Sequence, residues 1–223
     1  MSYGSTFPLW RDAAGATWRA YTHHAFVAGL ADGTLPRAAF LRYLVQDFVF
    51  LVHFSRAWAL AVTKAETLEE MRACAAIVHA LLDHEMRLHV ETCAAEGITE
   101  AELFEAREEP QNLAYTRYVL DAGHSGDFLD LMAALAPCVL GYGEIGARLA
   151  DEAVDTPYAG WIATYSGAEY QQTCGEVGAL IDGAVARRLG AAPEYNPRWS
   201  RLCARFEMAT RLEVDFWGMG LSA

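Results

Sequence analysis

The sequence predicts an all-α protein built as a single-domain helical bundle. Along most of the 223 residues, apolar side chains recur at intervals of three and four, which places them on one face of a helix. One such stripe comprises Leu131, Leu135, Cys138, Tyr142, Ile145 and Leu149. No segment shows the sustained apolar–polar alternation between turn signals that is typical of a half-buried strand. We therefore expect strands to be absent or trivial.

Glycine, proline and capping residues divide the chain into the helices that we expect. Their ranges are 8–29, 37–64, 67–95, 111–123, 127–150, 157–189 and 197–219. The pairs Thr156-Pro157 and Asn196-Pro197 are strong helix starts, because a capping residue precedes a proline whose fixed φ suits the first helical position. Pro137 removes a backbone donor inside the fifth range and should kink that helix beside Cys138. Without repeats or linkers, we expect one domain over residues 1–223.

The composition limits the class of partner. Hydrophobic residues make up 53% of the chain and the mean hydropathy is +0.09, yet no uninterrupted apolar stretch reaches the roughly 20 residues that a bilayer span needs. We expect the surplus apolar surface to fill a core and an oligomer interface. No export signal is evident in residues 1–10, so we expect a cytoplasmic protein. A net charge of −12 argues against nucleic acid and against an anionic membrane as partners.

The five cysteines predict neither disulfides nor a structural zinc site. They are Cys74, Cys93, Cys138, Cys174 and Cys203, and no two form a C-x-x-C pair. In a reducing compartment most such residues are small buried hydrophobes. Cys138 differs, because it follows a proline and shares its apolar stripe with a tyrosine one turn away. It is therefore a candidate nucleophile.

Two other apolar stripes are each interrupted by one carboxylate. Asp47 lies among Phe40, Leu44, Leu51, Phe54, Trp58 and Val62, and Glu213 lies among Leu202, Phe206, Ala209, Phe216 and Gly220. Burying an unpaired carboxylate costs several kcal/mol, so each needs a partner, a proton or a ligand. A structural interpretation gives Asp47 a buried tyrosine or amide and gives Glu213 an arginine, Arg56 or Arg211. Two buried carboxylates and a thiol on three helices favour a functional site instead.

Aromatic side chains and a histidine cluster accompany these residues. The aromatic residues are Phe48, Phe50, Tyr115, Tyr118, Tyr142, Trp161, Tyr165 and Trp217; most should be core, and a few could stack on a flat ring. The cluster is His79, Asp83, His84, Glu85 and His89. Its two i,i+4 pairs face different directions, and the Glu-x-x-His motif of di-iron bundles is absent. We expect solvent-facing or interhelical structural roles for the cluster, and no metal site.

In combination, the motifs resemble those of the TenA/thiaminase II family. The matching runs, in the family's order, are Phe26-Val27, Gly33-Thr34-Leu35-Pro36, Tyr43-Leu44-Val45-Gln46-Asp47, Pro137-Cys138 with Tyr142 and Glu144-Ile145-Gly146, Tyr158 with Trp161-Ile162-Ala163-Thr164-Tyr165, and Glu213 with Phe216-Trp217. They cover nearly the whole chain. Because Cys138 is present, the chain resembles the cysteine-bearing branch.

The resemblance implies a heme-oxygenase-like bundle without heme or another cofactor, assembled as a homotetramer. It also implies an aminopyrimidine aminohydrolase, or thiaminase II, which hydrolyses 4-amino-5-aminomethyl-2-methylpyrimidine, and thiamin, to 4-amino-5-hydroxymethyl-2-methylpyrimidine in thiamin salvage. Matched position by position, Cys138 is the nucleophile, Glu213 the acid/base and Asp47 the partner of the pyrimidine's amino edge. Phe50, Tyr115, Tyr142 and Tyr165 line the substrate pocket, although Tyr118 lies close to Tyr115 in sequence.

The chain also departs from the family pattern, and two other functions stay open. Phe48 and Phe50 stand where family members often have tyrosine, which keeps a ring face but removes a hydroxyl and could alter substrate preference. One alternative is a metal-dependent oxidase on the same fold, which needs a convergent His/carboxylate set. The other is a non-catalytic helical regulator, which leaves the buried carboxylates and the thiol without a purpose.

Overall fold

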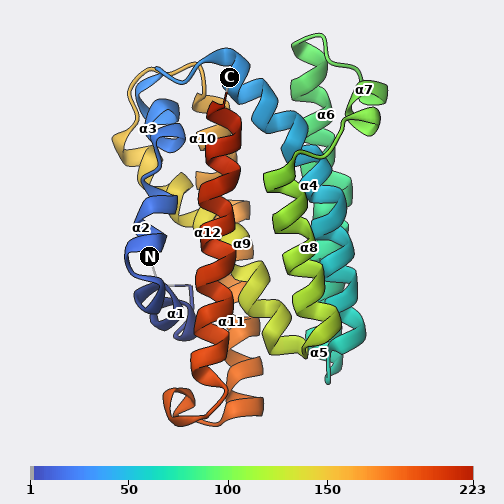
Figure 1. Ribbon diagram of the computed structural model, residues 1–223, viewed down its shortest axis with the longest axis vertical. Coiled ribbons are helices and arrows are strands. Elements are labelled where there is room, and N and C mark those ends of the chain that lie inside the picture. Colours follow the sequence, from blue (N-terminus) through green and yellow to red (C-terminus); the bar gives the residue numbers. More distant parts are fainter. Residues whose placement is uncertain (1–2, 223) are drawn as a thin grey trace.

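The computed structural model describes residues 3–222 and consists of helices packed side by side (Figure 1). In order they are α1 (Thr6–Ala14), α2 (Ala16–Thr22), α3 (Ala25–Asp32), α4 (Arg37–Lys64), α5 (Leu68–Ala80), the π-helical turn η1 (Leu81–Glu85), α6 (Met86–Ala95), α7 (Glu100–Glu105), α8 (Pro110–Ser125), α9 (Phe128–Glu152), α10 (Ala159–Ser166), α11 (Ala168–Leu189), the 3-10 turn η2 (Pro193–Tyr195) and α12 (Trp199–Leu221). Within these residues there is no strand, and the all-α prediction is confirmed.

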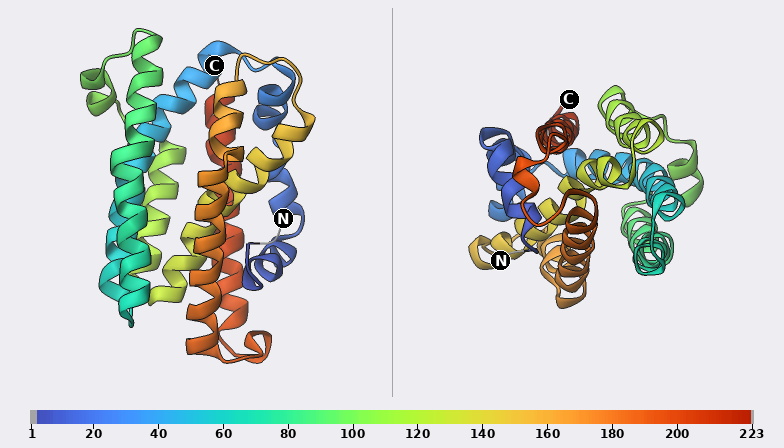
Figure 2. Two further views of the ribbon diagram at one scale, coloured as in Figure 1. Left: turned by 180° about the vertical axis from the view of Figure 1, so that it is seen from behind. Right: turned by 90° about the horizontal axis from the view of Figure 1, so that it is seen from below.

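Helix α9 lies at the centre of the bundle. It contacts α8, α10, α11 and α12 as well as α4, and the view from below shows it between α12 and α11 (Figure 2). Two of its glycines allow neighbouring chains to come close. A Cβ at Gly141 would lie 2.3 Å from the Tyr21 ring, and a Cβ at Gly146 would lie 2.5 Å from the backbone carbonyl carbon of Tyr165. Because these two glycines have no side chain, α2 and α10 can pack directly against the backbone of α9.

Two of these helices, α4 and α9, are long and apolar enough by length and composition to cross a membrane, although neither is an uninterrupted apolar run. In α9, 89% of the most apolar stretch is buried inside the bundle; in α4, 56% of the corresponding stretch is buried. Their composition therefore follows from their position, because a helix that is covered on several sides must be apolar on several faces.

The expected first helix, 8–29, is three helices. Gly15 adopts a positive φ of 50° and ends α1. The chain breaks again at His23 and His24, where the His24 ring accepts a hydrogen bond from the backbone N–H of Phe26 and caps α3. No proline marks either break, which is why the apolar periodicity alone predicted one helix.

Three further boundaries also differ from the prediction. The range 157–189 is interrupted at Gly167, whose extended backbone separates α10 from α11. The range 67–95 contains the η1 turn between α5 and α6. Helix α7 was not predicted, although Thr99 and Glu102 form a capping box at its start. The ends of α4, α8, α9 and α12 lie within two residues of the predicted ones.

Candidate active site

A cavity of about 500 Å³ lies between α4, the α5–η1 segment, α9, α10 and α11. Its size suits a small organic ligand. The groups in its wall that can bond or react include Asp47, Glu85, Cys138, Tyr142, Tyr165 and Tyr170. Four of the residues predicted from sequence, Asp47, Cys138, Tyr142 and Tyr165, are therefore together in one cavity although three different helices carry them.

Cys138 lies one residue after Pro137 on α9, and its thiol is partly accessible from the cavity. The carbonyls on either side of it accept hydrogen bonds from other helices: Tyr21 donates to the Pro137 oxygen at 3.3 Å, and Tyr170 donates to the Val139 oxygen at 3.2 Å. Tyr21 and Tyr170 thus donate to backbone carbonyls next to Cys138, in the part of α9 where Pro137 has no backbone N–H to donate. α9 is assigned as one continuous helix through Pro137, so the kink stays a prediction.

The thiol is held in its protonated form. Burial raises the pKa of Cys138 well above the ordinary value of a thiol, and the negative charges of Glu213, Glu85 and Asp47 raise it further. Two of these carboxyl groups, Asp47 and Glu85, line the same cavity as the thiol.

Glu213 on α12 is buried, with 1% of its surface exposed. Tyr115 on α8 donates a hydrogen bond to Glu213 Oε1 at 2.7 Å. Burial raises the pKa of Glu213 to about 8, and the bond from Tyr115 opposes that shift. Glu213 is therefore largely protonated at neutral pH. The structural interpretation that paired Glu213 with Arg56 or Arg211 is wrong. Arg211 contacts Glu207 instead, and Arg56 contacts His53.

Asp47 on α4 forms a buried pair with His89 on α6. The distance from His89 Nε2 to Asp47 Oδ2 is 2.6 Å, and each residue has 4% of its surface exposed. His89 Nδ1 lies 3.0 Å from the Glu85 carbonyl oxygen. Both ring nitrogens therefore face acceptors, which is the arrangement of a doubly protonated imidazolium. Tyr43 donates to the same Asp47 oxygen at 3.3 Å, so the expected tyrosine partner is confirmed.

The charge on His89 follows from these neighbours. Burial on its own would lower the pKa of His89, but the hydrogen bond to Asp47 and the negative charges of Asp47 and Glu85 raise it to about 9. Asp47 and His89 thus form an ion pair in the wall of the cavity at neutral pH.

Glu85 ends the η1 turn and faces the cavity. Tyr165 donates a hydrogen bond to its Oε1 at 3.2 Å. Burial raises the pKa of Glu85 to about 7; the positive His89 lowers it and the negative Asp47 raises it. Neither Glu85 nor His89 was among the predicted site residues. One signal was available: Leu81, Glu85, His89 and Cys93 recur every four residues, which places the polar pair on an apolar face.

The aromatic residues predicted for the pocket divide into two sets. Tyr142 and Tyr165 line the cavity and pack edge to face, with ring centroids 4.9 Å apart. Phe50 and Tyr115 pack against each other, also at 4.9 Å, beside Phe216 and outside the cavity lining. Tyr118 donates to the Arg205 carbonyl instead. Phe50 and Tyr115 thus form a layer with Phe216, and Glu213 joins it by accepting the hydrogen bond from Tyr115.

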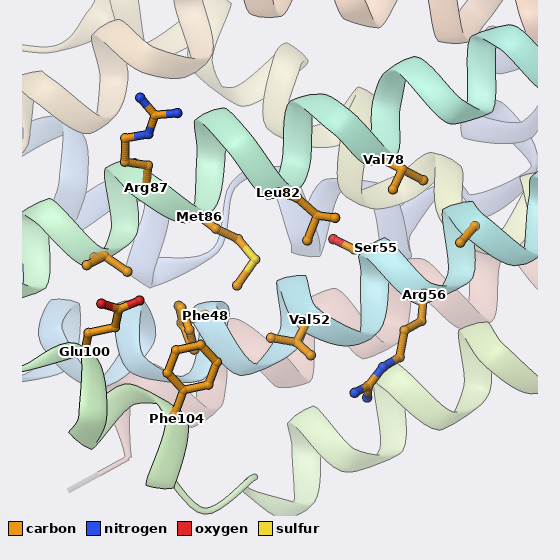
Figure 3. Close-up of a pocket in the computed structure, with 12 residues that line it drawn as sticks. Phe48, Val52, Ser55, Arg56, Val78, Leu82, Met86, Arg87, Glu100 and Phe104 are labelled. Atoms are coloured by element: carbon orange, nitrogen blue, oxygen red, sulfur yellow. The ribbon is translucent and has the colours of Figure 1, made fainter.

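A second hollow, of about 720 Å³, lies on another face of α4, between that helix and α5–η1–α6, with α7 at one end (Figure 3). Phe48, Val52, Leu82 and Met86 are among the apolar residues that line it. Figure 3 shows the Phe104 ring beside Phe48 and three charged residues, Arg56, Arg87 and Glu100, at the edges. No predicted catalytic or binding residue lines it, so the smaller cavity is the candidate active site.

The histidine cluster is divided as its spacing predicted. His79 pairs with Asp83 at 2.5 Å on the surface, whereas Glu85 and His89 point inward. Among the residues that the structure describes, no three His, Cys, Asp or Glu side chains come together as a group that could hold a metal ion. The oxidase alternative needs such a convergent set.

Comparison with known proteins gives consistent results. The protein-family model described as "TENA/THI-4/PQQC family" matches residues 11–223 of this chain. The chain is similar to an uncharacterized protein of Haemophilus influenzae (39% identity, covering 92% of this chain and 93% of that one) and to a protein of Halalkalibacterium halodurans named aminopyrimidine aminohydrolase (33% identity, covering 93% and 92%). Among solved structures, a protein described as a TenA family transcription regulator, from Silicibacter sp. TM1040, has 61% identity and a TM-score of 0.98, covering 99% of this chain and 98% of that one.

Proposed function

The chain belongs to the TENA/THI-4/PQQC family, and on this basis we propose that it is an aminopyrimidine aminohydrolase of the thiaminase II type. Its class as a hydrolase agrees with the curated relatives that carry the name aminopyrimidine aminohydrolase. Its proposed substrate is 4-amino-5-aminomethyl-2-methylpyrimidine, with thiamin as a second one. The product is 4-amino-5-hydroxymethyl-2-methylpyrimidine, formed as a salvage step in thiamin metabolism.

The observation that carries this proposal is the cavity that Asp47 and Cys138 share with Tyr142 and Tyr165. A pyrimidine is flat, and the two tyrosine rings offer it stacking surfaces. An amino group on the ring needs an acceptor, for which we assign Asp47 Oδ1, since His89 and Tyr43 both bond Oδ2. The thiol is then in the same cavity as the ring that it attacks.

The proposed reaction begins when the sulfur of Cys138 adds to a ring carbon. A C–S bond forms, the ring loses its aromaticity, and a ring nitrogen takes up a proton from Glu213. Glu213, now a carboxylate, takes up the proton of the Cys138 thiol. The net result is that one proton moves from the sulfur to the ring nitrogen. The electron pair next to the methylene then expels the leaving group.

Water completes the reaction by adding to the exposed methylene. A C–O bond forms, and the proton that the water loses goes to the departed amine or, with thiamin, to solvent. The ring nitrogen gives its proton back to the sulfur through Glu213 while the C–S bond breaks, which restores the aromatic ring and the thiol. The raised pKa of Glu213, about 8, suits a group that must hold a proton at neutral pH before donating it. The raised pKa of Cys138 means that its proton leaves during the attack and not before it.

A regulatory function is the second candidate, because the 61%-identical structure is described as a transcription regulator. A regulator needs a ligand cavity but no nucleophile. We favour catalysis because a buried carboxyl acts on the pKa of a thiol in the cavity wall, an arrangement that binding alone does not require.

The remaining expectations stand as proposals. We propose one domain over residues 1–223, a cytoplasmic location, no cofactor, and neither nucleic acid nor membrane as a partner. We also propose a homotetramer, for which exposed apolar side chains such as Leu82 and Phe104 offer surface to cover. Multi-angle light scattering of the purified protein measures the assembly.

Hydrolysis assays test the proposal. Metal-free protein is incubated in parallel with the aminomethyl pyrimidine and with thiamin, and the hydroxymethyl product is quantified by chromatography. Turnover of either substrate supports the hydrolase, and the ratio of the two rates identifies the preferred leaving group. Binding of the pyrimidine without turnover contradicts it and favours the regulator.

A further inference from the structure

Glu85 occupies an irregular point of the fold that aims its carboxyl into the cavity. The regular turns of α5 end at Ala80, the π-helical turn Leu81–Glu85 follows, and α6 begins at Met86. Single π turns inside helices occur frequently at functional sites. Glu85 is the last residue of this turn and lines the cavity together with Cys138.

Two hydrogen bonds hold Glu85 in position. Its carbonyl faces His89 Nδ1 at 3.0 Å, and its side chain accepts from Tyr165 at 3.2 Å. His89 is itself fixed by Asp47, and Tyr165 by its packing against Tyr142. The carboxyl is therefore preorganised before any ligand enters.

The proposed hydrolysis moves protons at two places, and one carboxyl cannot serve both. Glu213 serves the ring nitrogen, and it lies outside the cavity lining with its Oε1 engaged by Tyr115. The methylene, where an amine departs and water arrives, needs a second group. Two other carboxyl groups line the cavity: Asp47 is paired with His89, and Glu169 is exposed on α11. Glu85, which is less exposed than Glu169, is therefore the carboxyl that we assign to this step.

We propose that Glu85 is a further catalytic residue, which binds the departing group as a protonated amine and then removes a proton from the water that replaces it. This inference rests on the proposed function. An aliphatic amine is largely protonated at neutral pH, so the substrate enters as an ammonium ion and pairs with the Glu85 carboxylate.

The atoms balance over the step. When the C–N bond breaks, its electron pair stays on nitrogen, and the resulting ammonia remains in the cavity beside Glu85. Water then forms a C–O bond to the methylene while Glu85 takes one of its protons. Glu85 passes that proton to the ammonia, which leaves as ammonium, and the carboxylate is regenerated. A pKa of about 7 suits both halves of this exchange, and a bound ammonium ion favours the ionised form.

Glu85→Gln tests the inference, because the amide still accepts a hydrogen bond from Tyr165 but cannot take a proton. We expect kcat for the aminomethyl substrate to fall at least about 100-fold, and KM to rise. The matched control is Glu91→Gln on the exposed face of α6, which should retain wild-type rates. Glu85→Asp, which keeps a shorter carboxylate, should be more active than Glu85→Gln.

Chemical rescue separates a base from a structural residue. Azide needs no proton removed before it attacks, so in Glu85→Gln it should restore turnover and give the azidomethyl pyrimidine as product. A Glu85→Gln variant that hydrolyses the substrate at the wild-type rate, or an inactive one that azide does not rescue, overturns the inference while the wild-type assay upholds the proposed function. A wild type that turns over neither substrate overturns both.

Discussion

Replacement of Asp47 by Asn removes one negative charge from the wall of the cavity and almost no volume. The amide cannot form an ion pair with His89, and it presents a donor where the pyrimidine's amino group needs an acceptor. A hydrogen bond to a charged group contributes about 1.5–3 kcal/mol, and each 1.4 kcal/mol is a factor of ten. We therefore expect KM to rise about 10- to 100-fold, with a smaller change in kcat.

The same substitution changes how stability depends on pH. The pKa of His89 is raised from 6.5 to about 9 in the folded protein, so its contribution is fully present below about pH 6.5 and is lost as pH rises through about 9. That shift corresponds to about 3 kcal/mol. Asp47→Asn removes the two largest causes that raise the pKa of His89, and the stability difference between wild type and variant should shrink over that interval.

Two measurements check this prediction. Steady-state kinetics with the aminomethyl pyrimidine give KM and kcat, and urea unfolding followed by circular dichroism gives the free energy of unfolding at about pH 6 and at about pH 9.5. A KM within twofold of the wild-type value contradicts the assignment of Asp47 to the amino edge. A stability difference that does not change with pH contradicts the ion pair with His89.

Two further substitutions follow from the structure. Tyr115→Phe removes the hydrogen bond that holds down the pKa of Glu213, so the loss of activity at alkaline pH, expected near pH 8, should move to higher pH; a pH–rate profile that does not shift contradicts the acid role of Glu213. Gly146→Ala places a Cβ 2.5 Å from the backbone carbonyl carbon of Tyr165, and we expect a loss of about 1–3 kcal/mol in denaturant unfolding. The matched control Gly175→Ala meets no atom within 4 Å and should gain up to about 1 kcal/mol, so equal losses in both variants refute the close approach of α9 and α10.

The sequence predicted the long helices well because their apolar stripes are long. α4, α9 and α12 each present several turns of buried residues, and this period determines a helix without reference to the rest of the chain. The break at Gly167 was missed because a helix pattern tolerates an isolated glycine, and only tertiary packing decides whether it is extended. The resemblance to the TenA family, built from motifs along the whole chain, is confirmed by the match over residues 11–223.

The site was predicted where a polar residue interrupts an apolar stripe, and missed where the partner is distant in sequence. Asp47 and Cys138 stand out because their own helices are apolar around them. His89 is buried in a hydrogen-bonded pair with Asp47, which lies 42 positions earlier in the chain, and no local sequence pattern contains that contact. The four-residue recurrence of Leu81, Glu85, His89 and Cys93 indicates an apolar face, but it does not show that Glu85 lines a cavity with residues of α9 and α10.

The identity of the nucleophile is best tested with Cys138→Ser under single-turnover conditions. Wild-type protein mixed with a limiting amount of the aminomethyl pyrimidine should release ammonia and the hydroxymethyl product. The variant should bind the pyrimidine in calorimetry, because little volume is changed, yet release neither product. A variant that turns over at the wild-type rate contradicts a covalent step on Cys138, and with it the proposed mechanism.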